Sequence, residues 1–327
     1  MHSEMEPARV LEASGLVKRY RVGNSTLTAL DGVSIDLERG ETHGIVGESG
    51  CGKSTLAKLL VGLETPDAGE ISLQGKPRGK GRRRFRRSSR EIQMVFQDPY
   101  TALNPKMTAG DIVREPFEIH PDVVQKDERD ARVIELFERV GLPGEARHKY
   151  PAEFSGGQRQ RIGIARALAL DPSVIVCDES VAALDVSIQA QVLNLLNDLK
   201  DELGISYVFI SHDLSIMRQI SDRVSVLYLG RVVETGSVDD VFERPQHPYT
   251  RALLDAVPVP DPEVRTLEAP ALQGDVPSPL DIPSGCAFRT RCPFATELCA
   301  TETPELVARN SSPVGGVACH YPLPHDA

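Results

Sequence analysis

Residues 47–54, with the sequence Gly-Glu-Ser-Gly-Cys-Gly-Lys-Ser, constrain the fold of this chain more than any other stretch. They follow the apolar run 43–46 and precede a helical run at 55–60, so they join a buried strand to a helix. Three glycines let the backbone wrap a phosphate closely with its N–H groups inward, and the following helix adds its positive end. This context predicts an α/β domain that binds the phosphates of a nucleotide.

Two residues of the loop have predicted tasks of their own. Lys53 should reach the β and γ phosphates, and the hydroxyl of Ser54 should ligate magnesium. Cys51 is interpreted as a small loop residue rather than a reactive thiol. The residues predicted to contact the nucleotide here are Gly47, Ser49, Gly50, Cys51, Gly52, Lys53, Ser54 and Thr55.

Residues 174–179 form an apolar strand that ends in two carboxylates, Asp178 and Glu179. Charged groups at the end of a buried strand are costly unless a cation or a reaction uses them. We expect Asp178 to hold magnesium, directly or through water. Glu179 is the candidate general base for the water that attacks the γ phosphate.

Residues 154–158, Phe-Ser-Gly-Gly-Gln, open a long helical run. Ser155 is expected to cap that helix, which makes its amino end a second anion site. One chain needs only one site for the γ phosphate of its own nucleotide. The second anion site therefore indicates that this helix contacts a nucleotide bound to a partner chain. The predicted contacts are Ser155, Gly156, Gly157 and Gln158.

Taken along the chain, residues 47–54, 154–158 and 174–179 resemble the Walker A loop, the signature motif and the Walker B strand of ABC-transporter ATPases, in that order. The resemblance implies ATP and Mg²⁺ as cofactors. It also implies an α/β, P-loop NTPase ABC cassette: a RecA-like, mostly parallel sheet with antiparallel strands and a helical subdomain. We expect this domain to span 1–257, with the helical subdomain at about 98–165.

The resemblance assigns four further residues. Gln97 resembles the Q-loop glutamine that touches magnesium and the attacking water, and His212 resembles the switch histidine at the γ phosphate. Asp185 resembles the D-loop aspartate that crosses the dimer seam. Tyr20 resembles the aromatic residue on which adenine stacks.

The chain departs from the family pattern directly after Glu179. Ser180 and Ala182 stand where such proteins usually carry proline and serine. Proline would fix the backbone of this turn, so its loss predicts slower hydrolysis.

A closer resemblance is to the ATPases of oligopeptide and dipeptide importers, carried by residues 97–107, 150–158, 247–253 and 283–293. Glutamine at 158 resembles the second ATPase of a heterodimeric pair. The implied partners are another ATPase subunit, two membrane-spanning permease subunits and an extracytoplasmic solute-binding protein. Similar subunits serve dipeptides, oligopeptides, glutathione and nickel complexes, so the cargo stays open.

Residues 258–327 differ in composition from the rest of the chain, because 12 of the 24 prolines fall there. We expect a small irregular C-terminal module. It carries Cys286, Cys292, Cys299 and Cys319, spaced C-x5-C-x6-C-x19-C. That spacing departs from paired zinc motifs and from the ferredoxin run. A [4Fe-4S] cluster, a zinc ion and unligated thiols remain open, with the cluster favoured.

Composition restricts the partners. The formal net charge is −10, and eight basic residues gather at 78–90, where a surface loop or contact with anionic lipid or an acidic partner is expected. A single basic run on an acidic chain argues against nucleic-acid binding. No run of about 18 apolar residues and no export signal are seen, so we expect a peripheral subunit at the cytoplasmic face of the membrane.

The sequence disfavours three rival functions. A soluble ABC ATPase acting on ribosomes or DNA usually carries two cassettes or a long coiled-coil insertion, and neither is visible in the sequence. An ABC exporter subunit is disfavoured by the C-terminal segment and by residues 104–107. A degenerate cassette that only binds ATP is disfavoured because Glu179 and His212 are both present.

Overall fold

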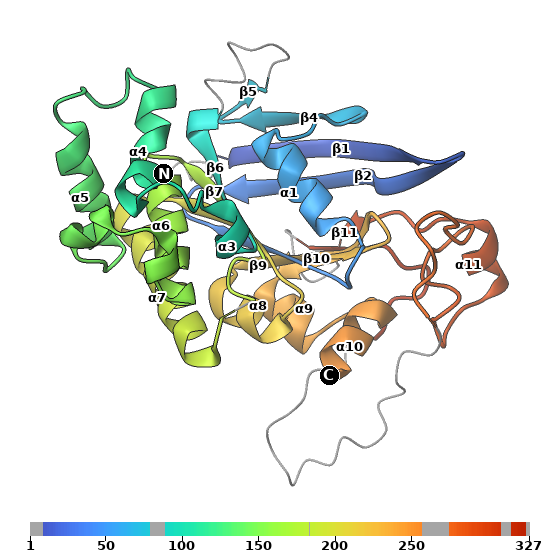
Figure 1. Ribbon diagram of the computed structural model, residues 1–327. Helices are drawn as coiled ribbons and strands as arrows, with labels where there is room; N and C mark the ends of the chain where they lie inside the picture. The colour runs from blue at the N-terminus through green and yellow to red at the C-terminus, as the bar shows by residue number, and fades with distance from the viewer. Residues whose placement is uncertain (1–8, 79–88, 183, 257–274, 309–314, 325–327) are drawn as a thin grey trace, which may run out of the picture.

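The computed structural model describes residues 9–78, 89–182, 184–256, 275–308 and 315–324 (Figure 1). The strands form two sheets, a four-stranded one in the order β2-β1-β4-β5 and an eight-stranded one in the order β11-β12-β10-β9-β3-β8-β7-β6. The small sheet is antiparallel and consists of β1 (Arg9–Val22), β2 (Ser25–Glu38), β4 (Ala68–Leu73) and β5 (Lys76–Pro77).

The large sheet has a parallel centre, because its strands are joined by helical crossovers. Its parallel strands are β6 (Ile92–Val95), β7 (Val174–Asp178), β8 (Ser206–Ile210), β3 (Thr42–Val46) and β9 (Arg223–Tyr228). β10 (Arg231–Ser237) returns antiparallel to β9 through a turn at Gly230. The predicted mostly parallel sheet with an antiparallel addition is confirmed.

The helices divide by location. α1 (Lys53–Val61) shares an apolar core with both sheets, through Leu56 and Leu60. The helices gathered on one side of the large sheet in Figure 1 are α3 (Pro99–Ala102), α4 (Ala109–Ile119), α5 (Arg129–Arg139), α6 (Gly156–Leu168) and α7 (Val186–Leu203), with short 3-10 turns at Gly144–His148 and Pro151–Glu153. α8 (Leu214–Ile220) lies in the last parallel crossover, between β8 and β9, and α9 (Val238–Glu243) and α10 (Pro248–Asp255) follow β10.

The C-terminal segment joins the large sheet. β12 (Gly316–Val317) pairs with β10, and β11 (Val307–Ala308) pairs with β12. α11 (Glu297–Thr301) lies beyond this edge. Phe288 is fully buried, and its ring centroid lies 5.3 Å from that of Tyr228. The segment therefore shares an apolar core with the nucleotide-binding part of the chain.

The basic run is described only at its two ends, and residues 79–88 lie outside the described part. Arg78 is not the solvated loop residue that the charge pattern predicted. Its guanidinium donates to the carbonyls of Leu59, Leu60 and Val61, the last turn of α1. A cation there stabilises the helix carboxyl end, and burial lowers the pKa of Arg78 to about 10.

Among the described residues, none of the helices combines the length and the apolar character that a membrane span requires.

Candidate nucleotide-binding site

The loop at 47–54 leaves β3 and enters α1 through three glycines in the left-handed half of backbone space. Gly47, Gly50 and Gly52 have φ values of 154°, 80° and 111°. A Cβ on Gly47 would lie 2.3 Å from the carbonyl oxygen of Leu227, and one on Gly52 would lie 2.4 Å from that of Ala29. Glycine is therefore required twice over, by conformation and by space.

Lys53 is the buried cation of this loop, with 5% of its surface exposed. Its Nζ donates to the carbonyl oxygens of Gly47 at 2.7 Å and Glu48 at 3.0 Å. Beside it the thiol of Cys51 is buried, and burial raises its pKa, so it stays protonated at neutral pH. A glycine-rich turn, a buried ammonium and a helix amino end together fit the phosphates of a nucleotide.

Ser54 and Asp178 meet at the mouth of the loop, although 124 residues separate them. The Ser54 hydroxyl donates to Oδ1 of Asp178 at 3.3 Å. Burial raises the pKa of Asp178, and the Ser54 hydrogen bond opposes the shift. A hydroxyl and a buried carboxylate are oxygen ligands of the kind that Mg²⁺ prefers, so these residues fit the predicted magnesium site.

Glu179 lies where β6, β7 and β8 end. Gln97 donates from Nε2 to Glu179 Oε2 at 2.6 Å, and His212 Nδ1 lies 3.2 Å from Oε1. The backbone of Glu179 is left-handed, with φ at 45°, a costly conformation for a non-glycine residue. The structure thus brings the three predicted catalytic side chains together at the carboxyl ends of parallel strands, the usual site of α/β chemistry.

The signature residues form a capping box on α6. The hydroxyl of Ser155 accepts from the N–H of Gln158 at 3.3 Å, and Oε1 of Gln158 accepts from the N–H of Ser155 at 3.0 Å. Gly157 packs so closely that a Cβ would lie 2.4 Å from Cγ2 of Ile188 on α7. Ser155, Gln158 and the α7 N-cap residue Asp185 are all exposed. The amino ends of both helices are therefore open to a second molecule.

Tyr20 lies near the carboxyl end of β1, close to the start of α1. Its hydroxyl bonds to the carboxylate of Glu64, and a hydrogen bond from Thr55 also reaches it. Lys18 Nζ lies 5.3 Å from the ring centroid. The structure thus places Tyr20 beside the loop at 47–54, which we call the phosphate loop. Adenine stacking on the Tyr20 ring stays a prediction.

The four late cysteines border one small cavity together with His247, Phe288 and Tyr321. Burial raises the pKa of Cys286 and Cys292, and that of Cys319 to about 11, which favours protonated thiols. Within the described ranges, no group of three or more His, Cys, Asp or Glu side chains is arranged to hold a metal ion. In this structure the four thiols are therefore not arranged as a metal site, and the [4Fe-4S] cluster stays a prediction.

Sequence reasoning missed three residues near the loop, Glu48, Tyr249 and Arg291. Arg291 forms an ion pair with Glu48, and the hydroxyl of Tyr249 accepts from the N–H of Glu48. More than 200 residues separate the partners of each contact, so no local pattern marks them.

Two family models match this chain. "ABC transporter" matches residues 30–182, and "Oligopeptide/dipeptide transporter, C-terminal region" matches residues 233–299. The oligopeptide transport ATP-binding protein OppF of Salmonella typhimurium is 52% identical over 284 residues, which is 86% of this chain and 85% of that protein. This chain belongs to the ABC transporter family. OppF of Escherichia coli is 51% identical over 285 residues, with the same two coverages.

Solved ABC proteins share the fold. The ATP-binding cassette MJ0796, a dimer in a post-hydrolysis state with ADP and Pi, gives a TM-score of 0.64 at 29% identity and covers 70% of this chain and 98% of its own. CbiO1 from Clostridium perfringens, part of the ABC transporter complex cbiONQ, gives 0.64 at 31% identity, covering 72% and 92%.

The turn after Glu179 gives a first testable prediction for this ABC protein. Ser180 is buried, and Ser180→Pro with Ala182→Ser should restore the usual rigidity and the hydroxyl at the seam. We expect ATP turnover to rise about 2- to 5-fold, the range that a loss of ~0.4–1 kcal/mol of backbone freedom would give. Steady-state hydrolysis by the assembled transporter measures it, and turnover at or below that of the unaltered protein would contradict the expectation.

Proposed function

We propose that this chain is the ATP-hydrolysing subunit of an ABC importer for short peptides. One observation carries the ATPase part: Gln97 and His212 converge on Glu179, next to the Ser54–Asp178 pair. Hydrolysis of a magnesium-bound polyphosphate would use all of these side chains, with Glu179 as the group that accepts a proton.

The site supports a simple sequence of steps. The phosphates of ATP enter the loop, and Lys53 turns from the carbonyls of Gly47 and Glu48 toward them. Ser54 and Asp178 would hold magnesium, which would offset the negative charge that develops on the phosphates. Glu179 then accepts a proton from the attacking water, which Gln97 and His212 help to orient.

The second half of each site comes from another cassette. In support, Ser155 caps an exposed helix end that offers an anion site, and MJ0796 is a dimeric cassette. We propose a heterodimer in which this chain supplies its signature helix to the partner's ATP, with Asp185 at the seam. Closure of two cassettes on two ATP molecules, and reopening after hydrolysis, would provide the force.

The transport role is supported by the C-terminal family match and by the names of both OppF relatives. We therefore propose that the chain lies at the cytoplasmic face of the membrane with two permease subunits and a solute-binding protein. We further propose the division into a nucleotide-binding domain at 1–257, with a helical subdomain at about 98–165, and a C-terminal module at 258–327.

Purification of the intact complex tests this function. Co-purification of a second ATPase, two permeases and a solute-binding protein, with ATP-dependent uptake of labelled dipeptides or oligopeptides into proteoliposomes, is the expected result. Uptake of glutathione or a nickel complex instead of peptides would replace the cargo but keep the ATPase. Copurification with ribosomes, or absence of permeases, would contradict import.

We also propose that the four late cysteines hold a [4Fe-4S] cluster after a local rearrangement. Thiolates are the ligands of such clusters, and metal binding supplies folding energy to a proline-rich segment with a small core. An anaerobically purified sample should contain about four irons per chain and absorb in the sulfide-to-iron band, and Cys292→Ser should lower both. Zinc in place of iron, or metal-free protein, would contradict the cluster.

A further inference from the structure

Arg291 holds the second residue of the phosphate loop. Its guanidinium donates two hydrogen bonds to Glu48, from Nη1 to Oε2 at 2.7 Å and from Nη2 to Oε1 at 2.9 Å. The Arg291 side chain is 5% exposed and the Glu48 side chain 23%. A bidentate and largely desolvated ion pair of this kind fixes the orientation of the Glu48 carboxylate and also neutralises its charge.

Glu48 is held at its backbone too. Its N–H donates to the hydroxyl of Tyr249 at 3.0 Å, and Tyr249 is fully buried. The carbonyl oxygen of Glu48 accepts from Nζ of Lys53. A displacement of Glu48 would therefore change the hydrogen bond of Lys53, the lysine predicted to contact the phosphates.

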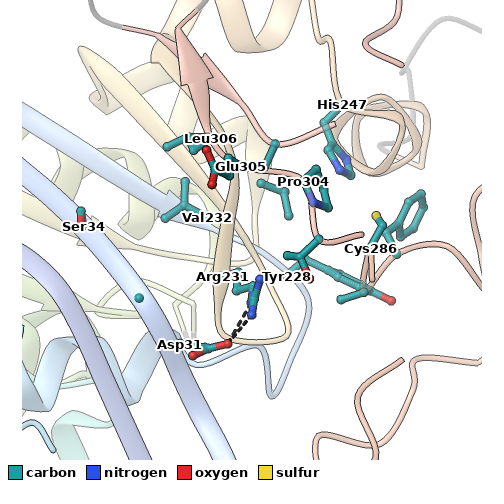
Figure 2. A pocket seen from close by; sticks show the side chains of 16 residues that line it. Asp31, Ser34, Tyr228, Arg231, Val232, His247, Cys286, Pro304, Glu305 and Leu306 are labelled. Carbon is teal, nitrogen blue, oxygen red and sulfur yellow. Dashed lines mark hydrogen bonds and ion pairs between the residues drawn. The ribbon is translucent and has the colours of Figure 1, made fainter. Parts of the chain in front are cut away.

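The segment that carries Arg291 runs between two cysteines. Phe288 of this segment packs on Tyr228 and Tyr249, with ring centroids 5.3 and 5.4 Å away, and its carbonyl accepts from the N–H of Arg291 at 3.0 Å. Figure 2 shows Tyr228 and Cys286 on the wall of a cavity of about 590 Å³ between the large sheet and the C-terminal segment. Residues 286–288 thus line this cavity together with Tyr228 of the large sheet.

We propose that Arg291 is a positioning residue that neutralises and anchors Glu48, so that the cysteine-bearing segment sets the affinity of the phosphate loop for ATP. A carboxylate in a loop that binds a polyanion opposes binding unless a cation compensates it. Arg291 supplies that cation without touching the nucleotide. The proposal rests on ATP being the ligand of the loop.

Equilibrium titration of the intact complex with a fluorescent ATP analogue, without magnesium, tests this role. Arg291→Met should weaken binding about tenfold, because Glu48 is left uncompensated beside the phosphates. Arg291→Lys keeps the charge but loses the two-pronged geometry, so a loss of about threefold is expected. The kcat at saturating ATP should change less than the KM.

The decisive variant combines Arg291→Met with Glu48→Gln. Removing the orphaned carboxylate should restore binding to within about threefold of the unaltered complex, which a purely structural role for Arg291 would not do. Arg289→Met is the matched control, because Arg289 donates to the carbonyl of Ser284 within the same segment. It should leave the affinity unchanged.

Two results would overturn the inference: unaltered ATP affinity in both Arg291 variants, or a loss that Glu48→Gln does not reverse. If the Arg291→Met complex does not assemble, Arg291→Lys takes its place. ATP affinity is then measured for Arg291→Lys with and without Glu48→Gln, and the inference again requires that Glu48→Gln restores the lost affinity. Failure of the unaltered complex to bind the analogue would instead contradict the proposed ATPase function.

Discussion

Glu179→Gln is expected to lower ATP hydrolysis by about 10²- to 10⁴-fold while ATP still binds. The amide keeps the size of the carboxylate and its contacts with Gln97 and His212, now 2.6 and 3.2 Å away, but it cannot accept the proton of the attacking water. Phosphate release by the assembled transporter, measured beside nucleotide binding, separates the two effects.

The matched control is Glu243→Gln, which removes a carboxylate from an exposed ion pair with Arg218. It should hydrolyse ATP at the original rate, because exposed pairs contribute little. If Glu179→Gln kept more than about a tenth of the original turnover, Glu179 would not be the general base. If the original complex released no phosphate and Glu179→Gln left uptake unchanged, the results would instead favour a cassette that only binds ATP.

Ser155→Asp is the second substitution with a large expected effect. Aspartate is as good a helix cap as serine, so the bond from the N–H of Gln158 and the stability of α6 should survive. A carboxylate, however, would face the γ phosphate of the partner's ATP. We expect hydrolysis at that site to fall by about 10²- to 10³-fold, the effect of losing a donor to a charged transition state.

Ser155→Ala provides the comparison. It should destabilise the protein by about 1 kcal/mol through the lost cap, yet reduce hydrolysis less than the aspartate variant does. Melting temperatures and turnover of the two variants should therefore rank in opposite orders. The same ranking in both measurements would mean that Ser155 acts only through the stability of α6.

Much of the fold could be predicted because its signals are local. The strands β3 and β7 are short apolar runs, and α6 begins directly after Ser155, as the sequence predicted. Asp178 and Glu179 were predicted from an apolar strand that ends in two carboxylates, whereas His212 was expected beside them only because of the resemblance to ABC ATPases.

Other features depend on contacts that no local pattern encodes. Arg78 belongs by sequence to a basic run, but its place is set by the carbonyls at the end of α1. The pairing of β12 with β10 and the ion pair of Arg291 with Glu48 join segments far apart in the chain. The grouping of four late cysteines suggested a metal site, but the described thiols border a cavity and are not arranged to hold a metal ion.

Photo-cross-linking shows whether the phosphate loop of one chain and the signature helix of another meet in a shared ATP site. A photoreactive amino acid in place of Gln158 is introduced with Glu179→Gln, and the assembled transporter is irradiated with ATP and magnesium. We predict a cross-link to the phosphate loop of the neighbouring ATPase that disappears with ADP. A product confined to this chain, or one equally strong with ADP, would contradict a shared site.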